Sequence, residues 1–195
     1  MDTYETLIKT FEKYIVLTPE EKELVKKFFI IRTFNKKDFL VNEGELCEGT
    51  FYILKGCVHS FFKGKHLEKH TTHFAIEDWW ITDMTSIIFQ KLALTSIQAL
   101  EPTTALFLSI KQSEKMFEAI PKMEKFFRIL SQRNQASFQQ RILHSLSMNA
   151  TERYLNFREK YGFLESRVPQ YMIASFLGIT PEFLSIIRNK LSKQK

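Results

Sequence analysis

The sequence is short of cysteine and has no long hydrophobic run. Cys47 and Cys57 are the only cysteines among the 195 residues, too few for a disulfide framework, a four-cysteine zinc site or an iron–sulfur cluster. No apolar run approaches the roughly 18 residues of a membrane span, and the charged N-terminus lacks the apolar core of a signal peptide. These absences exclude a transmembrane protein, argue against export and predict a cytoplasmic location.

What is present is a globular composition with unevenly distributed charge. Hydrophobic residues make up 44% and charged residues 26% of the chain, enough for the core of one or two compact domains. The formal net charge is +6, and residues 146–195 carry eight basic against four acidic side chains. A basic C-terminal unit suits a polyanionic partner, although charge alone fits a basic solvated surface equally well.

The chain from about residue 31 to residue 110 has the sequence pattern of short strands. Runs of β-branched and aromatic residues alternate with turn residues, and they span residues 32–34, 39–41, 50–54, 57–62, 68–76, 94–100 and 104–110. Strands at such close intervals predict an antiparallel barrel or jelly roll. A helix is expected before them, because residues 18–21 combine a capping threonine, a proline at the first helical position and a glutamate.

A long helix is predicted from Pro121 to about Ser147. Its apolar residues recur at helical spacing, at Met123, Phe126, Phe127, Leu130, Phe138, Ile142, Leu143 and Leu146. Such a helix needs a cover for its apolar face: a second copy of the chain would make it a dimerisation helix, and packing on the chain's own barrel is the alternative. A capping box at residues 149–152 predicts another helix, which ends at Tyr161-Gly162.

Residues 167–190, RVPQYMIASFLGITPEFLSIIRNK, carry the functional signal. A helix over 168–177 is followed by Gly178, which tolerates the positive φ of a tight turn, and Thr180-Pro181 begins a second helix. Helix, glycine turn and helix are typical of the helix-turn-helix, whose second helix enters the DNA major groove. An ordinary helical hairpin in a core is the alternative. The residues expected to face inward are Ile173, Ala174, Leu177, Phe183, Leu184 and Ile187.

Taken together, these segments resemble the Crp/Fnr family of bacterial transcription regulators over essentially the whole chain. The matching pieces are the β unit with Glu43-Gly44-Glu45 and Lys55-Gly56-Cys57, the long helix, the Glu152-Arg153-Tyr154 helix and residues 168–188. The resemblance implies an α+β protein with a cyclic-nucleotide-binding-like antiparallel β-roll or jelly roll in residues 1–120, a dimerisation helix in 121–147 and a winged-helix-type helix-turn-helix in 148–195. Only seven residues follow Arg188, so we expect the wing to be absent or reduced.

The effector does not follow from the resemblance. Members of the family that bind cyclic AMP hold its phosphate with an arginine followed by serine or threonine, after a Gly-Glu pair. The corresponding stretches here, residues 77–80 and 93–99, contain no arginine, so we predict no cyclic AMP binding. Oxygen-sensing members use a cysteine cluster that this chain lacks. Glu77, Trp79 and Trp80 are the candidates for a pocket that takes a neutral or cationic, partly aromatic effector.

The recognition helix departs from the family as well. Pro181 and Ile186 stand where the family's well-studied regulators have arginines, and only Glu182 is carried over, as an acceptor for cytosine N4. We predict base contacts from Thr180, Glu182 and Ser185, with Asn189 a further polar candidate. Contacts to phosphates are predicted from Arg188, Lys190, Lys193 and Lys195, and Gln170 and Tyr171 are expected to anchor the first helix to the DNA backbone.

Other sites have weaker support. His66, His70 and His73 lie near one another in the sequence, but no paired ligand spacing or carboxylate joins them, so no metal and no cofactor is predicted. A redox role for the cysteines is the less common alternative to buried, inert thiols. No nucleophile–base set, phosphate loop or dinucleotide fingerprint is present, and we do not expect an enzyme.

The sequence thus predicts a homodimeric, sequence-specific DNA-binding transcription regulator. Its expected partners are double-stranded DNA, a second copy of the chain, RNA polymerase and an unidentified small-molecule effector, with no membrane. The alternative function is a ligand-binding or protein-interaction module of the same fold with weakened DNA binding, which Ile186 and the short C-terminus favour. A metal-dependent barrel enzyme is a more distant rival.

Overall fold

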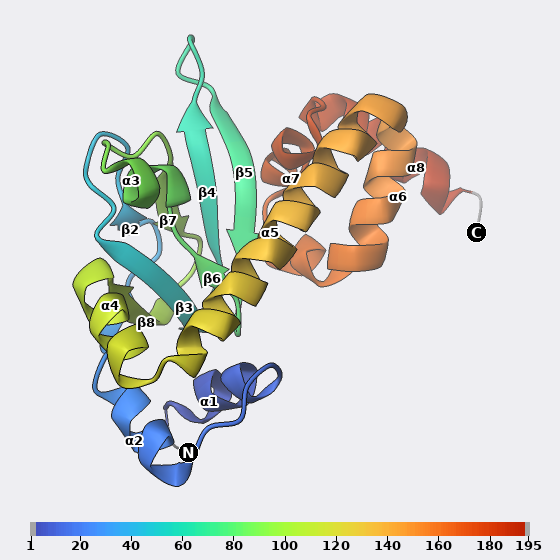
Figure 1. The fold of residues 1–195 in the computed structure, drawn as a ribbon. Coiled ribbons are helices and arrows are strands. Elements are labelled where there is room, and N and C mark those ends of the chain that lie inside the picture. Colours follow the sequence, from blue (N-terminus) through green and yellow to red (C-terminus); the bar gives the residue numbers. More distant parts are fainter. Residues whose placement is uncertain (1–2, 194–195) are drawn as a thin grey trace.

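The second of the two N-terminal helices begins where the sequence predicts. In the computed structural model, which describes residues 3–193, helix α1 (Glu5–Glu12) is followed by α2 (Pro19–Lys26). The Thr18 hydroxyl accepts a hydrogen bond from the Glu21 amide, and the Glu21 carboxylate accepts one of 2.7 Å from the Thr18 amide. The predicted capping box is therefore confirmed. Both helices lie at the opposite end of the molecule from the C-terminal helices (Figure 1).

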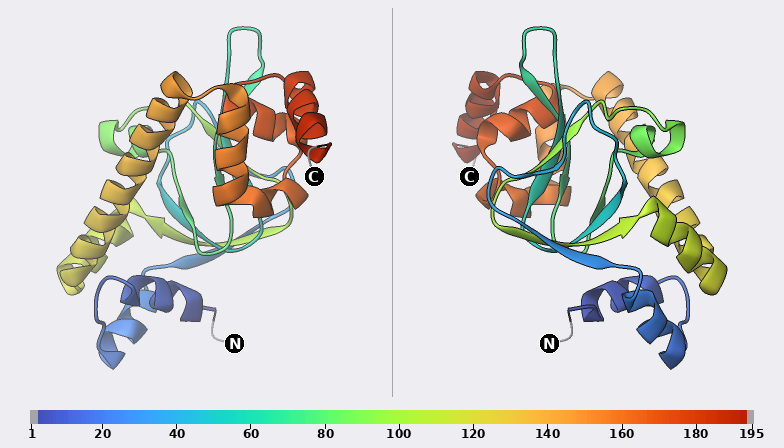
Figure 2. Two further views of the ribbon diagram at one scale, coloured as in Figure 1. Left: turned by 90° about the vertical axis from the view of Figure 1, so that its right-hand side faces the viewer. Right: turned by 90° about the vertical axis from the view of Figure 1, so that its left-hand side faces the viewer.

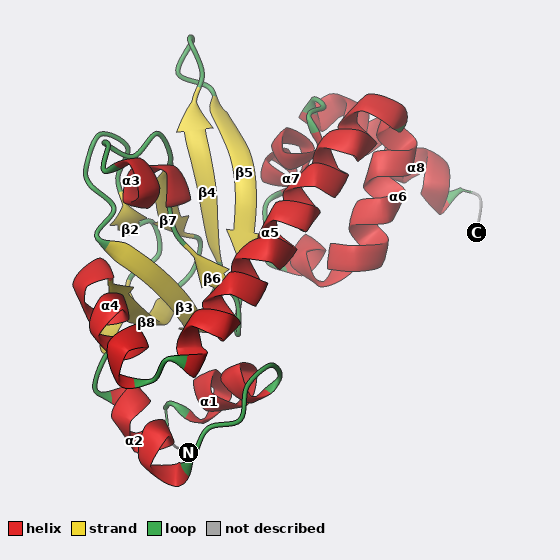
Figure 3. Cartoon of the chain, viewed as in Figure 1, coloured by secondary structure: helices red, strands yellow, loops and turns green. Residues whose placement is uncertain are grey.

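Two four-stranded antiparallel sheets form the β-roll (Figure 3). One sheet has the order β1-β8-β3-β6 and the other β2-β7-β4-β5. The strands are β1 (Ile30–Phe34), β2 (Phe39–Val41), β3 (Gly49–Lys55), β4 (Val58–Lys63), β5 (Lys69–Ala75), β6 (Trp80–Ile81), β7 (Ser96–Ala99) and β8 (Thr103–Ser109). In register, Phe51 of β3 stands opposite Phe107 of β8. The predicted strands are confirmed to within two residues at each end, whereas β6 and helix α3 (Met84–Phe89) were not predicted.

Two apolar clusters hold the β-roll together. The cluster between the sheets includes Ile53, Val58, Ile97 and Ala105, all fully buried. The other joins the outer face of one sheet to α1, to α4 (Ile110–Ala119) and to the start of α5 (Lys122–Ser147); it includes Leu7, Phe11, Tyr52, Leu106, Met116, Met123 and Phe126. Each such side chain contributes roughly 1.5–3 kcal/mol by leaving water, so the N-terminal helices are an integral part of this domain.

Helix α5 is covered by its own chain over only part of its length. Met123 and Phe126 are buried beneath α1 and β3. Farther along, the side chains of Phe138, Ile142, Leu143 and Leu146 are between 45% and 80% exposed. Packing on the chain's own barrel therefore accounts for the first turns, and a second copy as the cover for the remaining turns stays a prediction.

The C-terminal helical unit consists of α6 (Ala150–Tyr161), the 3-10 helix η1 (Gly162–Ser166), α7 (Gln170–Leu177) and α8 (Pro181–Ser192). The Asn149 side chain accepts hydrogen bonds from the Thr151 and Glu152 amides, and the Glu152 carboxylate accepts one from the Asn149 amide, which confirms the second capping box. The core of the unit includes Tyr154, Phe157, Ile173, Ala174, Leu184 and Ile187 and extends to Cys57 and Phe74 of the β-roll. The unit therefore packs against the sheet instead of standing apart from it (Figure 2). Residues 110–193 contain no strand.

Two details of the predicted helix pair were wrong. The first helix begins at Gln170 and not at residue 168, because Pro169 stands at the N-cap with an extended ψ of 141°. Phe183 does not face inward: its side chain is 46% exposed, whereas Leu184 and Ile187 are buried. Successive helical residues are rotated by about 100°, so Phe183 lies about 40° from Ile187 and about 100° from Leu184, at the edge of the inner face, where its side chain stays partly exposed.

Among residues 3–193, no single helix is long and apolar enough to span a membrane. Helices α7 and α8 reach that length and apolarity only together, and they are bent by 99° at the turn between them.

Candidate DNA-binding surface and effector region

The turn between α7 and α8 has the geometry that the sequence predicts. Gly178 has a left-handed φ of 68°, and its amide donates to the Ser175 carbonyl while the Ile179 amide donates to the Ala174 carbonyl. These two bonds end α7 in the manner of a glycine C-cap. The Thr180 hydroxyl then accepts a hydrogen bond of 3.2 Å from the Phe183 amide and caps α8. The arrangement matches a helix-turn-helix in which α8 is the recognition helix.

The outer face of α8 brings most of the predicted DNA contacts together. Glu182, Ser185, Ile186 and Asn189 follow each other at helical spacing and are exposed. Thr180 and Lys190 are exposed beside them, Arg188 is half-buried, and Gln170 and Tyr171 lie exposed at the start of α7. Lys193 is exposed, and Lys195 lies outside the described residues. Hydrogen bonds from the Glu182 backbone amide and from the Thr180 side chain lower the pKa of Glu182. The Glu182 carboxylate is therefore charged and able to accept hydrogen bonds.

Helix α7 is fastened to the edge of the β-roll. Strand β5 is the last strand of its sheet, so one side of its backbone needs partners. The Thr71 amide donates to the Ser175 hydroxyl at 2.9 Å, and that hydroxyl donates to the Lys69 carbonyl at 3.1 Å. A single serine of the helix-turn-helix therefore satisfies two backbone groups of the strand and fixes the position of α7 relative to the sheet.

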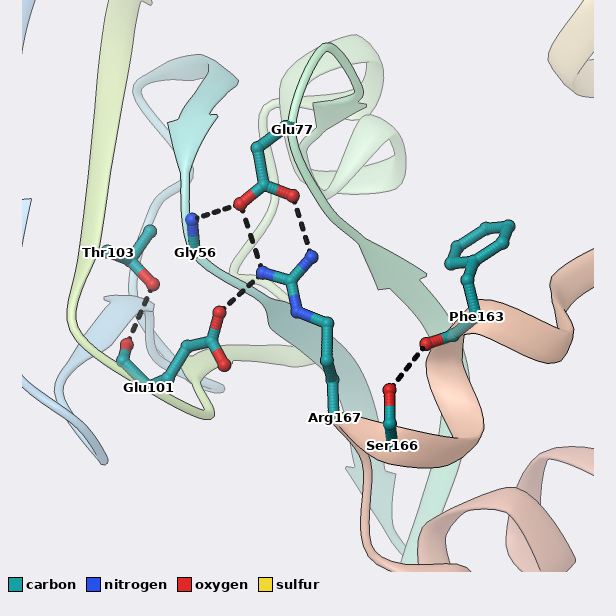
Figure 4. A network of polar contacts seen from close by, with 7 residues as sticks. All are labelled: Gly56, Glu77, Glu101, Thr103, Phe163, Ser166 and Arg167. Atoms are coloured by element: carbon teal, nitrogen blue, oxygen red, sulfur yellow. Dashed lines mark hydrogen bonds and ion pairs between the residues drawn. The ribbon is translucent and has the colours of Figure 1, made fainter.

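Glu77 is part of an ion-pair network between the domains (Figure 4). The Arg167 guanidinium donates to both carboxylate oxygens of Glu77, at 2.7 and 3.0 Å, and also to Glu101. The Gly56 amide donates to the same Glu77 carboxylate at 2.7 Å. Hydrogen bonding to Arg167 lowers the pKa of Glu77 to about 2. The pairing of Glu77 with Arg167 has no local sequence signal, because the two residues lie 90 positions apart in the chain.

The structure does not bring the three predicted effector residues to one pocket. Trp80 lies in the N-terminal core, with its ring 5.0 Å from Tyr52 and 5.3 Å from Phe127. Trp79 points the other way, toward Tyr161 and Phe163 of the C-terminal helical unit, at 6.0 and 6.3 Å. Adjacent strand residues face opposite sides of a sheet, which separates the two tryptophans.

A buried aspartate stands next to the stretch that corresponds to the family's phosphate-binding arginine. The Asp83 carboxylate accepts hydrogen bonds from the Ser86 amide at 2.9 Å and from the Thr95 amide and hydroxyl at 3.1 and 2.7 Å. It thereby caps α3. These are donors that could otherwise serve an anion, so the residues present do not fit a cyclic phosphate. Asp83 is not among the residues predicted from the sequence, although an aspartate directly before a short apolar run is an N-cap signal.

Burial favours the neutral forms of three titratable side chains of the β-roll, Cys57, His59 and His73. Cys47 and Cys57 are buried free thiols, and burial raises the pKa of Cys57 to about 12. Burial also lowers the pKa of both His59 and His73 to about 4. Within residues 3–193, no group of three or more histidine, cysteine, aspartate or glutamate side chains is arranged to hold a metal ion.

Comparison with known proteins places this geometry in context. Residues 31–119 match the family model of the cyclic nucleotide-binding domain. CLP, a c-di-GMP-responsive global regulator from Xanthomonas campestris, is similar in structure with a TM-score of 0.73 at 10% identity, over 91% of this chain and 93% of that chain. FixK2 from Bradyrhizobium japonicum gives 0.73 at 14% identity over 85% of each chain. The Thermus thermophilus catabolite activator protein gives 0.55 at 18% identity, over 91% of this chain and 85% of that chain.

No curated protein sequence matches the chain significantly, and at these identities the structural likeness establishes the fold alone. That fold extends across the β-roll, α5 and the helix-turn-helix, which is the whole arrangement that the sequence resemblance implied. Residues 31–119 therefore match the cyclic nucleotide-binding domain, and the chain as a whole shares its fold with these Crp/Fnr regulators.

Proposed function

We propose that the protein is a sequence-specific DNA-binding transcription regulator that acts as a homodimer. The observation that carries the proposal is the capped, outward-facing helix α8, whose exposed face has Glu182, Ser185 and Asn189 at helical spacing. Residues 148–195 would form the DNA-binding domain, residues 1–120 the β-roll domain and residues 121–147 the dimerisation helix. The basic excess of residues 146–195 favours a phosphate backbone as the partner.

Dimerisation would place two copies of α8 in successive major grooves, roughly 34 Å apart. The exposed apolar side chains on the last turns of α5, Ile142, Leu143 and Leu146, support this assembly, because exposed apolar stripes on a long helix usually have a partner. Light scattering of the full chain at micromolar concentration tests it: the proposal requires twice the 23.1 kDa chain mass, and a monomer mass would contradict it. RNA polymerase as a further partner stays a prediction from the family resemblance.

The β-roll would sense an effector other than cyclic AMP. The support for this is the absence of arginine from residues 93–99 and the buried Asp83 carboxylate, which occupies the nearby amide and hydroxyl donors. A second anion at that position would meet a negative charge and donors already in use.

A gel-shift series tests the proposed function directly. The full chain is titrated against its own upstream region and against random DNA of the same length, at several salt concentrations. We expect tighter binding to the upstream region and a steep fall of log affinity with log salt. Equal affinity for both DNAs at moderate salt would contradict sequence-specific regulation.

A second candidate function is a ligand-binding or protein-interaction module that retains the fold with weakened DNA binding. One observation favours it: Ile186, in the middle of the outer face of α8, is 61% exposed, and a branched apolar side chain there forms no hydrogen bond to a base edge. The same gel-shift series separates the two functions, because the module would bind all DNA weakly and with a shallow salt dependence.

A further inference from the structure

A cavity of about 510 Å³ lies between the β-roll and the C-terminal helical unit. Its walls come from β5, from residues 137–145 of α5, from α6 and from the turn between α7 and α8. It is separate from the Asp83 region, because none of the residues of α3 lines it. Its volume lies in the range of small-molecule sites, and a molecule inside it would touch both domains.

The charges that line this cavity are all positive. Arg141, Arg153 and Lys160 line it, and none of its described lining residues is an aspartate or a glutamate. The Arg141 guanidinium donates to the backbone carbonyls of Thr72 and Phe176 and forms no ion pair within residues 3–193. Burial lowers the pKa of Arg141, as expected for a cation that has lost water without gaining a counter-charge.

Arg153 is likewise held by backbone carbonyls. Its Nε donates to the Leu177 carbonyl at 3.1 Å and its Nη1 to the Met148 carbonyl at 2.8 Å, with no carboxylate partner in the described part of the chain. Each guanidinium has five N–H donors in a planar fork that suits a carboxylate, and both Arg141 and Arg153 still have donors that these carbonyls do not use. The structure therefore holds two anchored arginines at one cavity that has no anion of its own.

Aromatic side chains make up part of the remaining wall, beside neutral polar residues such as Thr71, Gln140 and Asn156. Phe138, Phe176, Phe157 and Trp79 are among its lining residues. The Phe176 ring centroid lies 4.1 Å from the Arg141 guanidinium carbon, and the His73 ring meets Phe138 edge-on at 4.5 Å. An aromatic ring would find stacking and edge contacts on these walls.

We propose that this cavity binds a small aromatic carboxylate, with the carboxylate on Arg141 and Arg153 and the ring among Phe138, Phe176 and Trp79. This class differs from the neutral or cationic effector expected from Glu77 and the tryptophans, since Glu77 is occupied by Arg167. The ligand would contact β5, α5 and α7 at once, so its binding favours the docked position of the helix-turn-helix. The binding site does not depend on the proposed DNA-binding function, and only its coupling to DNA rests on that function.

Fluorescence titration of the full chain tests the site with a matched pair of probes, naphthalene-2-carboxylate and its neutral carboxamide. We expect saturable binding of the carboxylate at one molecule per chain, with at least tenfold weaker binding of the carboxamide. Arg141→Gln should weaken carboxylate binding at least tenfold. Arg128→Gln, which removes the same charge from an exposed position on the same helix, should leave it unchanged.

Ser137→Trp is a second test of the site, which distinguishes loss of the binding site from misfolding of Arg141→Gln. Ser137 is an exposed residue that lines the cavity, so a tryptophan there should block binding while the thermal unfolding midpoint stays within one or two degrees of the parent. Equal affinity for carboxylate and carboxamide, or binding that survives both Arg141→Gln and Ser137→Trp, would overturn the proposal. Because this titration contains no DNA, its failure is distinguishable from a negative gel shift.

Discussion

Arg167 holds Glu77 in a two-pronged ion pair that joins the C-terminal helical unit to the β-roll. The two residues lie 90 positions apart in the chain, and the paired nitrogen and oxygen atoms are 2.7 and 3.0 Å apart. The same guanidinium also contacts Glu101. One arginine thus connects the start of the helix-turn-helix segment to two turns of the β-roll, and its removal should loosen the contact between the domains.

Arg167→Gln should lower the free energy of unfolding by about 1–2 kcal/mol. The loss is that of charge-assisted hydrogen bonds, made smaller because solvent partly screens the exposed pair. The effect should depend on pH. The folded pKa of Glu77, about 2, lies below its ordinary value of 4.5. The stabilisation by the Arg167–Glu77 ion pair is therefore present above pH 4.5 and is lost as the pH falls toward 2. Urea unfolding at pH 7 and pH 3 measures both expectations.

The matched control for this pair is Arg128→Gln. Arg128 is exposed, and its guanidinium donates a hydrogen bond to Gln132 on the same helix. A loss of stability that is equal in the two variants, or independent of pH in Arg167→Gln, would show that the ion pair does not hold the domains together.

A buried histidine should make the β-roll sensitive to mild acid. His59 is 1% exposed and stacks on Phe61, and within the described residues its ring nitrogens have at most the Gln98 side chain as a hydrogen-bond partner. Burial lowers its pKa from 6.5 to about 4, so the folded state disfavours its protonation. The contribution of neutral His59 to the free energy of unfolding is fully present above pH 6.5 and is lost as the pH falls. At pH 5 the loss amounts to about 2 kcal/mol.

His59→Phe keeps the aromatic stacking and removes the titration. We expect its unfolding free energy to change less than that of the parent between pH 7 and pH 5, by urea denaturation followed with far-UV circular dichroism. His66→Gln, at an exposed turn position, is the control and should retain the parent's pH dependence. An unchanged slope in His59→Phe would contradict the assignment. His73 contributes in the same direction.

Replacement by alanine should have opposite effects on stability at two glycines of the C-terminal helical unit. Gly178 has a φ of 68°, where an L side chain costs roughly 1–2 kcal/mol, so Gly178→Ala should destabilise by about that amount. Gly162 has a helical φ of −55°, and nothing lies within 4 Å of an added Cβ at either position. Gly162→Ala should therefore stabilise, by about 0.4–1 kcal/mol. Thermal unfolding of both variants measures the sign, and the same sign in both would contradict the turn geometry.

The elements of the fold could be read from local sequence signals. Thr18, Asn149 and Thr180 each mark a helix start, and each makes the predicted capping bond, because a capping bond joins residues two or three positions apart. The strands followed from turn residues at short intervals. The two-residue strand β6 and the one-and-a-half turns of α3 carry too few residues for a periodic signal.

The contacts between the domains could not be read in the same way. Glu77 looked like an effector ligand because Arg167 is remote in sequence, and Trp80 looked like a pocket residue because α1 and α5, which cover it, are far from it in the chain. The cavity near Arg141 depends on how α7 packs against β5. Such contacts depend on tertiary packing, and a single sequence carries no direct signal of it.

Cyclic AMP should not bind to this protein. The buried Asp83 carboxylate already accepts three hydrogen bonds near the stretch that corresponds to the family's phosphate-binding arginine, and that stretch, residues 93–99, contains no arginine. Isothermal titration calorimetry of the full chain should give no saturable heat up to millimolar nucleotide. A micromolar dissociation constant would contradict this prediction.

Two residues of α8 should affect DNA binding in different ways. Glu182 stands exposed in the first turn, where base contacts concentrate in this motif. Arg188 lies six residues farther along and is half-buried, so it should reach phosphate and not the floor of the groove. Arg188→Ala is then expected to weaken binding to all sequences about equally and to reduce the salt slope by about one unit.

Glu182→Ala should instead relax the preference at one base pair, by roughly 1–3 kcal/mol of discrimination, with little change in the salt slope. The lowered pKa of Glu182 keeps its carboxylate charged, so the lost interaction is a hydrogen bond to a base donor, and removal of the negative charge should slightly strengthen non-specific binding. Selection of bound sites from random DNA, combined with salt titrations, separates the two variants. If Glu182→Ala selected the parent's sequence while Arg188→Ala selected a different one, the roles assigned to the two residues would have to be exchanged, and α8 would lie in the groove in another orientation.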